Sequence, residues 1–311
     1  MDYESHGYAV IFSLRQKAAE EAQRLPDLLL KADRIATSIL SGEHNQRRSG
    51  SGEKFWQYRE YDPSDRPQDI DWRQTAKGDR VFIRQKEWQT TQTALFWCQN
   101  NSAMDYHSDK DLPTKHENAV VMALALSILA TNTGEQVAAL NSSDMPGRQD
   151  TALEKLARHV TAHKTDDLPM AADMNPAKHS TVFLLGDFLA PVDSIKDRLK
   201  NLKERTENIV LIQILDPAEL TLPFDGRGIF RTPETSAAHS HEYLIENIET
   251  IRSAYRDRID GHNAALSELC RKQGWHYIRH STDVPVSESL QALWGIMRSH
   301  SVHNRAGGNA R

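Results

Sequence analysis

Four carboxylates lie close together in one polar segment, at Asp62, Asp65, Asp69 and Asp71. Paired acids at one site can carry out acid–base or metal-assisted hydrolysis. Each of these aspartates, however, has an Arg or Lys near it in the sequence, and Asp62-Pro63 has the composition of a turn fixed by an aspartate side chain. We therefore expect ion pairs, such as Asp71 with Arg73 or Arg59, and keep metal-assisted hydrolysis as the alternative.

A second group of possible metal ligands consists of His239, His241 and Glu242. These residues precede a stretch with helical periodicity, where Ser240 or a neighbour can cap the helix, so a solvated helix start is expected instead. The sequence contains no Gly-x-x-x-x-Gly-Lys-Ser/Thr, Gly-x-Gly-x-x-Gly or Gly-x-Ser-x-Gly motif. Walker-type ATP binding is therefore not expected.

The charge balance of the 311 residues is mildly acidic, with a net charge of −5. It argues against a nucleic-acid binder that uses a positive field over the whole domain. The two cysteines, Cys98 and Cys270, are too few for a disulfide framework or a cysteine metal site. A reducing compartment is the simplest setting.

The first residues lack the basic start and the apolar run of a signal peptide. The most apolar helical stretch, Ala119–Ala130, is far shorter than the ~20 residues of a membrane span. We therefore expect a soluble protein of the cytoplasm.

The N-terminal part has two kinds of pattern. Leu14–Ser41 carries apolar residues at three- and four-residue steps, which predicts an amphipathic helix whose better half starts at Pro26. Ser41–Gly52 has the composition of a loop, and the aromatic and charged segment after it lacks helical periodicity. Val81–Ile83 predicts a short strand.

Strands alternate with helices from residue 93 onward. Strands are expected at Thr93–Cys98, Gln136–Leu140, Thr181–Leu185, Asn208–Leu215 and Gly274–Ile278. Helices are expected at His116–Ala130, Thr151–His163, Ser194–Glu204 and Glu242–Lys272. This alternation predicts an α/β domain with a doubly wound, mostly parallel sheet, whose binding site lies at the carboxyl ends of its strands.

The segment Arg47–Trp88 resembles the signature of the domain-of-unknown-function 58 family. The resemblance rests on Arg59-Glu60-Tyr61, on Asp65, and on Ile70-Asp71-Trp72-Arg73, with Ser64 where the family usually has Gly. It implies a von Willebrand factor A-like, Rossmann-like domain after an N-terminal helical and extended arm. The expected division is 1–90 for this arm, 91–299 for the α/β domain and 300–311 for a disordered tail.

The same resemblance identifies a loop for comparison with metal-binding domains, where Asp-x-Ser-x-Ser follows the first core strand. Aligned on Met104, this chain has Gln99, Asn101 and Ala103 at the three ligand positions. An alternative register would let Asn100 and Ser102 serve, but a neutral amide is a poor substitute for a carboxylate in binding Mg²⁺. Asp187 matches the second carboxylate of such domains, and Thr165 loosely matches their threonine. A degenerate site without metal is therefore expected.

The expected function is that of a non-enzymatic protein-interaction module without a cofactor. The resemblance implies a MoxR-type AAA+ ATPase as the partner. Two groups of residues are expected to matter. The partner or ligand face comprises Gln99, Asn100, Asn101, Ser102, Met104 and Asp187, and the arm is organised by Arg59, Asp65, Asp69, Asp71, Trp72 and Arg73. A packed Trp72 is part of this prediction. A metal-dependent binding module of the same fold is the second alternative, beside the hydrolase.

Overall fold

The computed structural model describes residues 27–41, 55–61, 70, 72–76, 80–86, 92–162, 164, 168, 180–200, 202, 205–206, 208–231 and 242–294. The chain divides into two compact units. One contains Met1–Ser41 and Gln92–Arg311, and the other contains Gly42–Thr91. The helix at 27–41 thus groups with the α/β unit, to whose core it contributes Ala32, Ala36 and Ile39. The tail expected to be disordered lies outside the described residues.

The smaller unit is built on an antiparallel pair of strands. β1 (Phe55–Glu60) pairs with β2 (Phe82–Lys86), and the short helix α2 (Trp72–Thr75) lies between them in the chain. The Oγ1 atom of Thr75 accepts a hydrogen bond from the backbone N–H of Phe82 at 3.0 Å, which joins α2 to β2. The strand predicted at Val81–Ile83 corresponds to β2, whereas β1 was not predicted.

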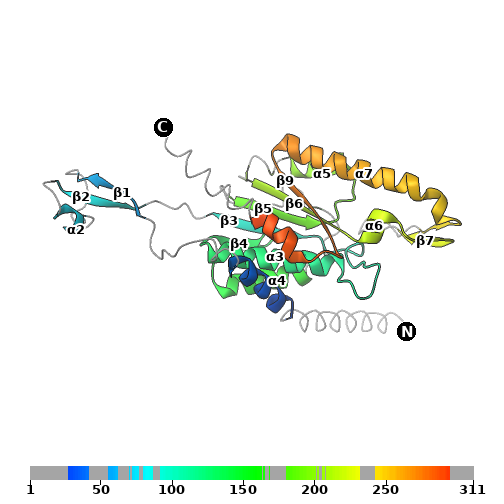
Figure 1. Cartoon of the computed structure of the whole chain (residues 1–311), viewed down its shortest axis with the longest axis horizontal. Helices are drawn as coiled ribbons and strands as arrows, with labels where there is room; N and C mark the ends of the chain where they lie inside the picture. Colours follow the sequence, from blue (N-terminus) through cyan, green and yellow to red (C-terminus); the bar gives the residue numbers. More distant parts are fainter. Residues whose placement is uncertain are drawn as a thin grey trace, which may run out of the picture. The chain divides into compact units, whose positions relative to one another are not determined.

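The larger unit contains a five-stranded sheet. Its strands are β3 (Thr93–Cys98), β4 (Gln136–Ala139), β5 (Ser180–Gly186), β6 (Asn208–Leu215) and β9 (His276–Ser281). They lie in the order β4-β3-β5-β6-β9, and every pairing is parallel. All five correspond to predicted strands. The prediction of a mostly parallel sheet flanked by helices is therefore confirmed (Figure 1).

The order of the strands defines where a site can form. From β3 the chain moves to β4 on one side, and then crosses to β5 on the other side of β3. The loops that follow β3 and β5 therefore leave the sheet in a shared crevice at the carboxyl ends of the strands. Ligands of open α/β sheets bind at such a point.

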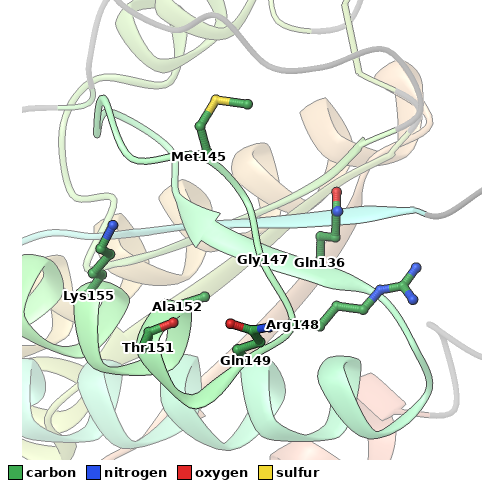
Figure 2. Close-up of a pocket in the computed structure, with 8 residues that line it drawn as sticks. All are labelled: Gln136, Met145, Gly147, Arg148, Gln149, Thr151, Ala152 and Lys155. Carbon is green, nitrogen blue, oxygen red and sulfur yellow. The ribbon is translucent and has the colours of Figure 1, made fainter.

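The outer edge of β4 is covered by the segment that follows it. Val137 exchanges backbone hydrogen bonds with Gly147 in a single antiparallel bridge, which shields part of the edge from other strands. A groove of about 470 Å³ lies here, between β4 and the start of α4 (Asp150–Ala162). Figure 2 shows the side chains of Met145, Arg148 and Lys155 pointing in different directions around this groove.

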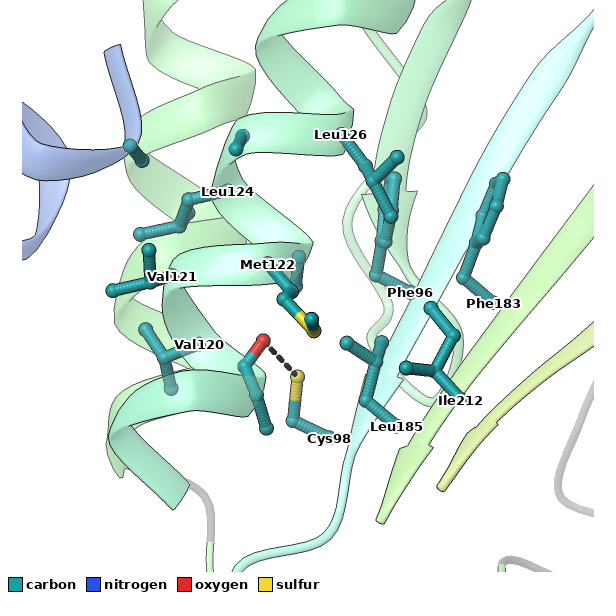
Figure 3. Close-up of a cluster of buried hydrophobic side chains, with 14 of the residues drawn as sticks. Phe96, Cys98, Val120, Val121, Met122, Leu124, Leu126, Phe183, Leu185 and Ile212 are labelled. Atoms are coloured by element: carbon teal, nitrogen blue, oxygen red, sulfur yellow. Dashed lines mark hydrogen bonds between the residues drawn. The ribbon is translucent and has the colours of Figure 1, made fainter. Parts of the chain in front are cut away.

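One face of the sheet packs on α3 (Lys115–Asn132) and α4. Figure 3 shows Met122 and Leu126 of α3 pointing toward the strands, while Val121 and Leu124 point toward the helix at 27–41, drawn in blue. Because α3 is covered on both sides, it is apolar almost all round, as its sequence indicated. Within the sheet, Phe96 and Phe183 stack with ring centroids 5.0 Å apart.

The opposite face packs on α5 (Val192–Leu199) and α7 (Ile248–Gln273). Every second residue of each strand points to this side. Leu184 of β5 and Leu211 of β6, for example, belong to the same buried cluster as Leu266 of α7. Both cysteines are buried and free, Cys98 under α3 and Cys270 near the end of α7. Among the described residues, no helix is long and apolar enough to cross a membrane.

The long helix predicted at Glu242–Lys272 is wrong at its start. Glu242–Ile245 forms strand β8, which pairs antiparallel with β7 (Gly228–Arg231), and the helix begins only at Ile248. The prediction started the helix too early because Leu244 and Ile248 have helical spacing. In the structure, residues 242–245 instead pair with β7. The short helix α6 (Pro217–Thr221) was also not predicted.

Candidate functional site

The crevice at the carboxyl ends of the strands contains a fully buried lysine. Lys115 has no exposed side-chain surface, and its Nζ atom lies 2.6 Å from Oε1 of Glu219 and 3.4 Å from Oδ2 of Asp187. Lysine is almost never fully buried unless its charge is paired. One ammonium thus joins the first turn of α3, the end of β5 and helix α6.

Local sequence explains why Lys115 begins the helix. Thr114 is the N-cap: its hydroxyl accepts from the backbone N–H of Glu117, and the Glu117 side chain accepts from the backbone N–H of Thr114. This places Lys115 at the first helical position, where the partial positive charge of the helix end disfavours a cation. The two carboxylates offset that repulsion.

Glu219 is positioned by a second capping box. Asp216 follows β6 and caps α6, with Oδ1 accepting from the N–H of Ala218 at 2.8 Å. Glu219 Oε2 accepts from the N–H of Asp216 at 2.9 Å, so only Oε1 turns to Lys115. The other oxygen of Asp216, Oδ2, accepts from the N–H of Ser108 at 2.9 Å, which ties down the long loop before α3.

Asp187 is held in place by groups of the neighbouring strands. The side-chain Oε1 of Gln99 accepts from the N–H of Asp187 at 3.0 Å, and Nε2 of Gln213 donates to the Asp187 carbonyl at 2.9 Å. The Gln99 side chain lies against Gly186, where an added Cβ would overlap its Oε1. The chain then turns sharply at Phe188, whose φ of 48° is in the left-handed region.

The expected partner or ligand face is only partly at the surface. Asn100 is buried and donates from Nδ2 to the carbonyl of Thr161 at 3.1 Å, and Asn101 is buried with Oδ1 accepting from the N–H of Met104. Met104 is fully buried in the core, so its predicted place on the partner or ligand face is wrong. Among the six, Ser102 alone is exposed, and Gln99 is half-buried. The loop is therefore mostly internal.

Few of the predicted arm residues are described. Asp65, Asp69 and Asp71 lie outside the described residues, as do Asp62 and Thr165. Arg59 lies in β1, opposite Ile83. Trp72 and Arg73 are exposed in α2, and the Trp72 side chain is 67% exposed. The interpretation of Trp72 as a packed indole is therefore wrong.

The carboxylates dominate the electrostatics of the crevice. Burial raises the pKa of Glu219, although the neighbouring Lys115 ammonium acts to lower it. Burial, followed by the charge of Glu219, raises the pKa of Tyr255 to about 12. Burial and the charges of Asp216 and Glu219 raise the pKa of Tyr106. One ammonium does not fully balance the acids around it.

Among the described residues, neither the strand ends nor the groove beside β4 is arranged as a metal site. No group of three or more His, Cys, Asp or Glu side chains is placed to hold a metal within the part of the chain that the structure describes. At the crevice, Lys115 fills the space in front of both carboxylates, so its residues as they stand do not fit a divalent ion. The groove of Figure 2 is lined by no acid, His or Cys, and its Lys155 pairs with Asp144 at 3.2 Å.

The sequence analysis identified Asp187 but missed Lys115, its ion-pair partner, and Glu219, the second carboxylate on Lys115. Lys115 was overlooked because lysines are almost never fully buried, and its polar sequence neighbours give no local sign that this one is. Glu219 stands three residues after Asp216, with Pro217 between them, which is the pattern of a helix start with a capping box. This local signal was available in the sequence.

Two mycobacterial proteins resemble this chain along most of its length. They are the uncharacterized protein Mb1516 of Mycobacterium bovis and the uncharacterized protein Rv1480 of Mycobacterium tuberculosis. Each is 25% identical over 285 residues, which cover 84% of this chain and 85% of the relative. These similarities extend across both compact units.

Among solved structures, the PilB minor pilin from Streptococcus sanguinis gives a TM-score of 0.32 at 12% identity, covering 71% of this chain and 64% of that chain. A similarity of this size carries no argument about fold or function. The comparison with protein families is more informative, because the family model described as "Protein of unknown function DUF58" matches residues 57–265. That match spans both the arm and the strand-end crevice, and the chain therefore belongs to the DUF58 family.

Proposed function

We propose that this protein is a non-enzymatic protein-interaction module with a doubly wound, von Willebrand A-like domain, and that its partner is a MoxR-type AAA+ ATPase. Membership of the DUF58 family supports the proposal, since the resemblance of the signature implies this partner. The cytoplasm is the compartment in which such a pair would meet. No nucleotide-binding loop of the Walker type occurs in the sequence, so ATP hydrolysis belongs to the partner.

The observation that carries the proposal is the buried Lys115 ammonium between Asp187 and Glu219. In a metal-dependent interaction module, a carboxylate of the partner can complete the coordination of an exposed metal ion. Here the cation belongs to the protein and no part of it reaches the surface. Gln99 fills the space above Gly186 in the same crevice. Binding therefore uses the outer surface of this end and needs no metal.

The exposed residues at this end define the proposed contact surface. β6 ends next to α6, and the hairpin of β7 and β8 follows, so the hairpin extends from the carboxyl end of the sheet (Figure 1). Ile229 and Leu244 face each other across the hairpin and are 58% and 49% exposed. Contiguous exposed apolar surface marks interaction sites, and this pair is the apolar centre of the proposed contact surface. Ser102 adds a polar group from the loop after β3.

A pull-down tests the partner and its independence of metal. The tagged full-length protein is incubated with extract of its native host, in parallel with EDTA and with Mg²⁺, and bound proteins are identified by mass spectrometry. We expect equal recovery of a MoxR-type ATPase under both conditions. Recovery of no such ATPase would reject the partner. Recovery that EDTA abolishes would instead favour the metal-dependent binding module.

A matched pair of variants tests the surface. The Ile229→Thr, Leu244→Thr double variant changes the exposed pair, whereas Met145→Thr changes an exposed apolar residue beside β4, away from the hairpin. We expect the double variant to lose the ATPase and Met145→Thr to retain it. Equal recovery with both variants, at unchanged melting temperature, would reject the hairpin as the contact surface.

A further inference from the structure

One face of the β7–β8 hairpin carries two parallel rows of exposed side chains. In an antiparallel pair, residues that lie opposite each other point to the same face, and so does every second residue along each strand. The register of the two strands and the ion pair between Arg227 and Glu246 at 3.5 Å show which residues share this face. We call it the outer face, and its exposed residues are Arg227, Ile229 and Arg231 in the row of β7, and Glu242, Leu244 and Glu246 in the row of β8.

The opposite face of the hairpin is the one that meets the rest of the domain. A Cβ added at Gly228 would lie 2.7 Å from Cδ1 of Ile248, the first residue of α7. Phe230 and Ile245 share this face and are half-buried, while Tyr243 remains exposed. The hairpin thus rests on the start of α7 and presents its outer face to solvent.

The charges of the outer face are separated by strand. The row of β7 reads cation, apolar, cation, and the row of β8 reads anion, apolar, anion. A surface with this pattern is complementary to a second copy of itself. When a two-fold axis runs along the strands, β7 of one copy lies over β8 of the other. Arg231 then faces Glu242 of the second copy, and Ile229 faces Leu244 of the second copy.

Other symmetric arrangements of two hairpins bring like charges together. If β7 lies over β7, or if the two β7 edges pair side by side around Ile229, then Arg227 faces Arg231 of the second copy. The same arrangements made with β8 place Glu242 against Glu246. Like charges that face each other across an interface are unfavourable. The charge pattern therefore selects one arrangement, with β7 over β8.

We propose that two copies of this protein form a symmetric dimer through the outer face of the hairpin, with β7 of each copy packed on β8 of the other. Two-fold symmetry makes each contact twice, so the centre contains two Ile229–Leu244 contacts and each end contains four alternating charges. A contact surface of this small size is typical of weak, reversible association. The dimer does not depend on the ATPase. If the ATPase binds the same face, as the proposed function holds, the dimer excludes it.

The test measures self-association of the purified full-length protein by sedimentation velocity over a wide range of concentrations. We expect a monomer at low concentration and a dimer at high concentration. Arg231→Glu places Glu against Glu242 of the second copy, so the dissociation constant should rise at least roughly tenfold. Glu242→Arg should have the same effect. No ATPase is present, so the result is independent of the proposed partner.

Two rescue experiments distinguish a lost contact from a damaged hairpin. The double variant Arg231→Glu, Glu242→Arg restores opposite charges both within the chain and between copies, so its dimer should return. An equimolar mixture of the two single variants should likewise form a mixed dimer. Arg271→Glu, which breaks an exposed ion pair with Glu268 on α7, is the control and should dimerise like the natural protein.

Several results would overturn the proposal. One is a protein that stays monomeric at every concentration at which it is soluble. Another is a dimer that Arg231→Glu does not weaken, which would place the interface elsewhere. Stronger association of Arg231→Glu would indicate β7 over β7, because Glu at position 231 would then face Arg227. A double variant that is folded, as judged by its melting temperature, but remains monomeric would also contradict the proposed pairing.

Discussion

At the scale of single residues, the crevice depends on one positive charge. Lys115 is fully buried and contacts two acids that come from elements 72 and 104 residues away in the chain. Attraction between the charges is strong in a buried environment, but so is the cost of removing them from water. Removing one of the charged side chains therefore lowers the free energy of unfolding by more than the intact ion pair adds to it.

Replacing Lys115 with Met tests this argument. The apolar side chain keeps most of the volume but leaves Asp187 and Glu219 without their cation, so we expect a loss of about 3 to 5 kcal/mol in the free energy of unfolding. Lys155→Met breaks an exposed ion pair with Asp144 and should change the free energy of unfolding by less than about 1 kcal/mol. Urea denaturation measures both. Equal effects of the two substitutions would contradict a special role for Lys115.

At the scale of elements, the ends of the strands are fitted tightly to one another. β5 ends in Gly186, and the Gln99 side chain from the end of β3 occupies the space where a larger residue would place its Cβ. The same Gln99 amide binds the N–H of Asp187. Gly186 is thus required by the close approach of a neighbour, and its φ is not among the positive values.

Gly186→Ala tests this packing. The new Cβ overlaps Oε1 of Gln99 and lies 3.0 Å from its Cβ, so Gln99 must move and its hydrogen bond to Asp187 is lost. Overpacking of this kind costs about 1 to 3 kcal/mol. We expect the double variant with Gln99→Ala to recover part of the loss, measured by urea denaturation. Additive losses would show that the two residues do not conflict.

A buried histidine between β9 and the helix at 286–294 makes the stability of the fold depend on pH. His280 is buried, its Nδ1 lies 2.9 Å from the Ser289 hydroxyl, and Nε2 has no partner among the described residues. Burial lowers its pKa from 6.5 to about 4, although the charge of Asp283 acts in the opposite direction. The neutral imidazole is therefore the form that the fold accepts.

The sign of the effect follows from proton uptake. Between pH 6.5 and about 4, the unfolded chain binds a proton at His280 that the folded protein does not. The free energy of unfolding therefore falls as the pH is lowered through this range, by up to about 3 kcal/mol from this group. Urea midpoints at several pH values should fall less steeply for His280→Leu. Parallel curves for the two proteins would rule out His280 as the source.

At the scale of the whole molecule, the described surface carries an exposed apolar pair on the β7–β8 hairpin. Ion pairs flank it at both ends, Arg231 with Glu242 at 2.7 Å and Arg227 with Glu246 at 3.5 Å. The charges along the hairpin are therefore largely balanced within the molecule. A partner surface that matches it is apolar at its centre.

Substitutions on the hairpin should separate binding from stability. In Ile229→Thr, Leu244→Thr, two polar residues that suit a strand replace the exposed pair, so we expect the free energy of unfolding to change by no more than about 0.5 kcal/mol. Binding to the purified ATPase, measured by calorimetry, should fall below detection. A large loss of stability would show that the pair supports the fold.

Much of the fold could be predicted because its pattern is local. The strands β3, β5 and β6 are short apolar runs, and α3 is an apolar run of helical length, so alternation along the chain was sufficient to predict a parallel sheet. Asp187 was singled out through the family resemblance, and its place directly after a buried strand puts it at the carboxyl end of the sheet. The β7–β8 hairpin was missed because the local pattern of the β8 segment favoured a helix and the pairing with β7 is made only in the folded chain.

The sequence by itself determined the strands, the helix α3 and the place of Asp187 at the end of β5. The tertiary structure decided what surrounds Asp187. Only folding brings Lys115, Asp187 and Glu219 within ion-pair distance, because long-range packing of α3 and α6 at the sheet edge sets their positions. It also decided that Met104 lies in the core and Trp72 at the surface. An isolated Met or Trp has no periodic pattern, and burial depends on what the rest of the chain packs against it.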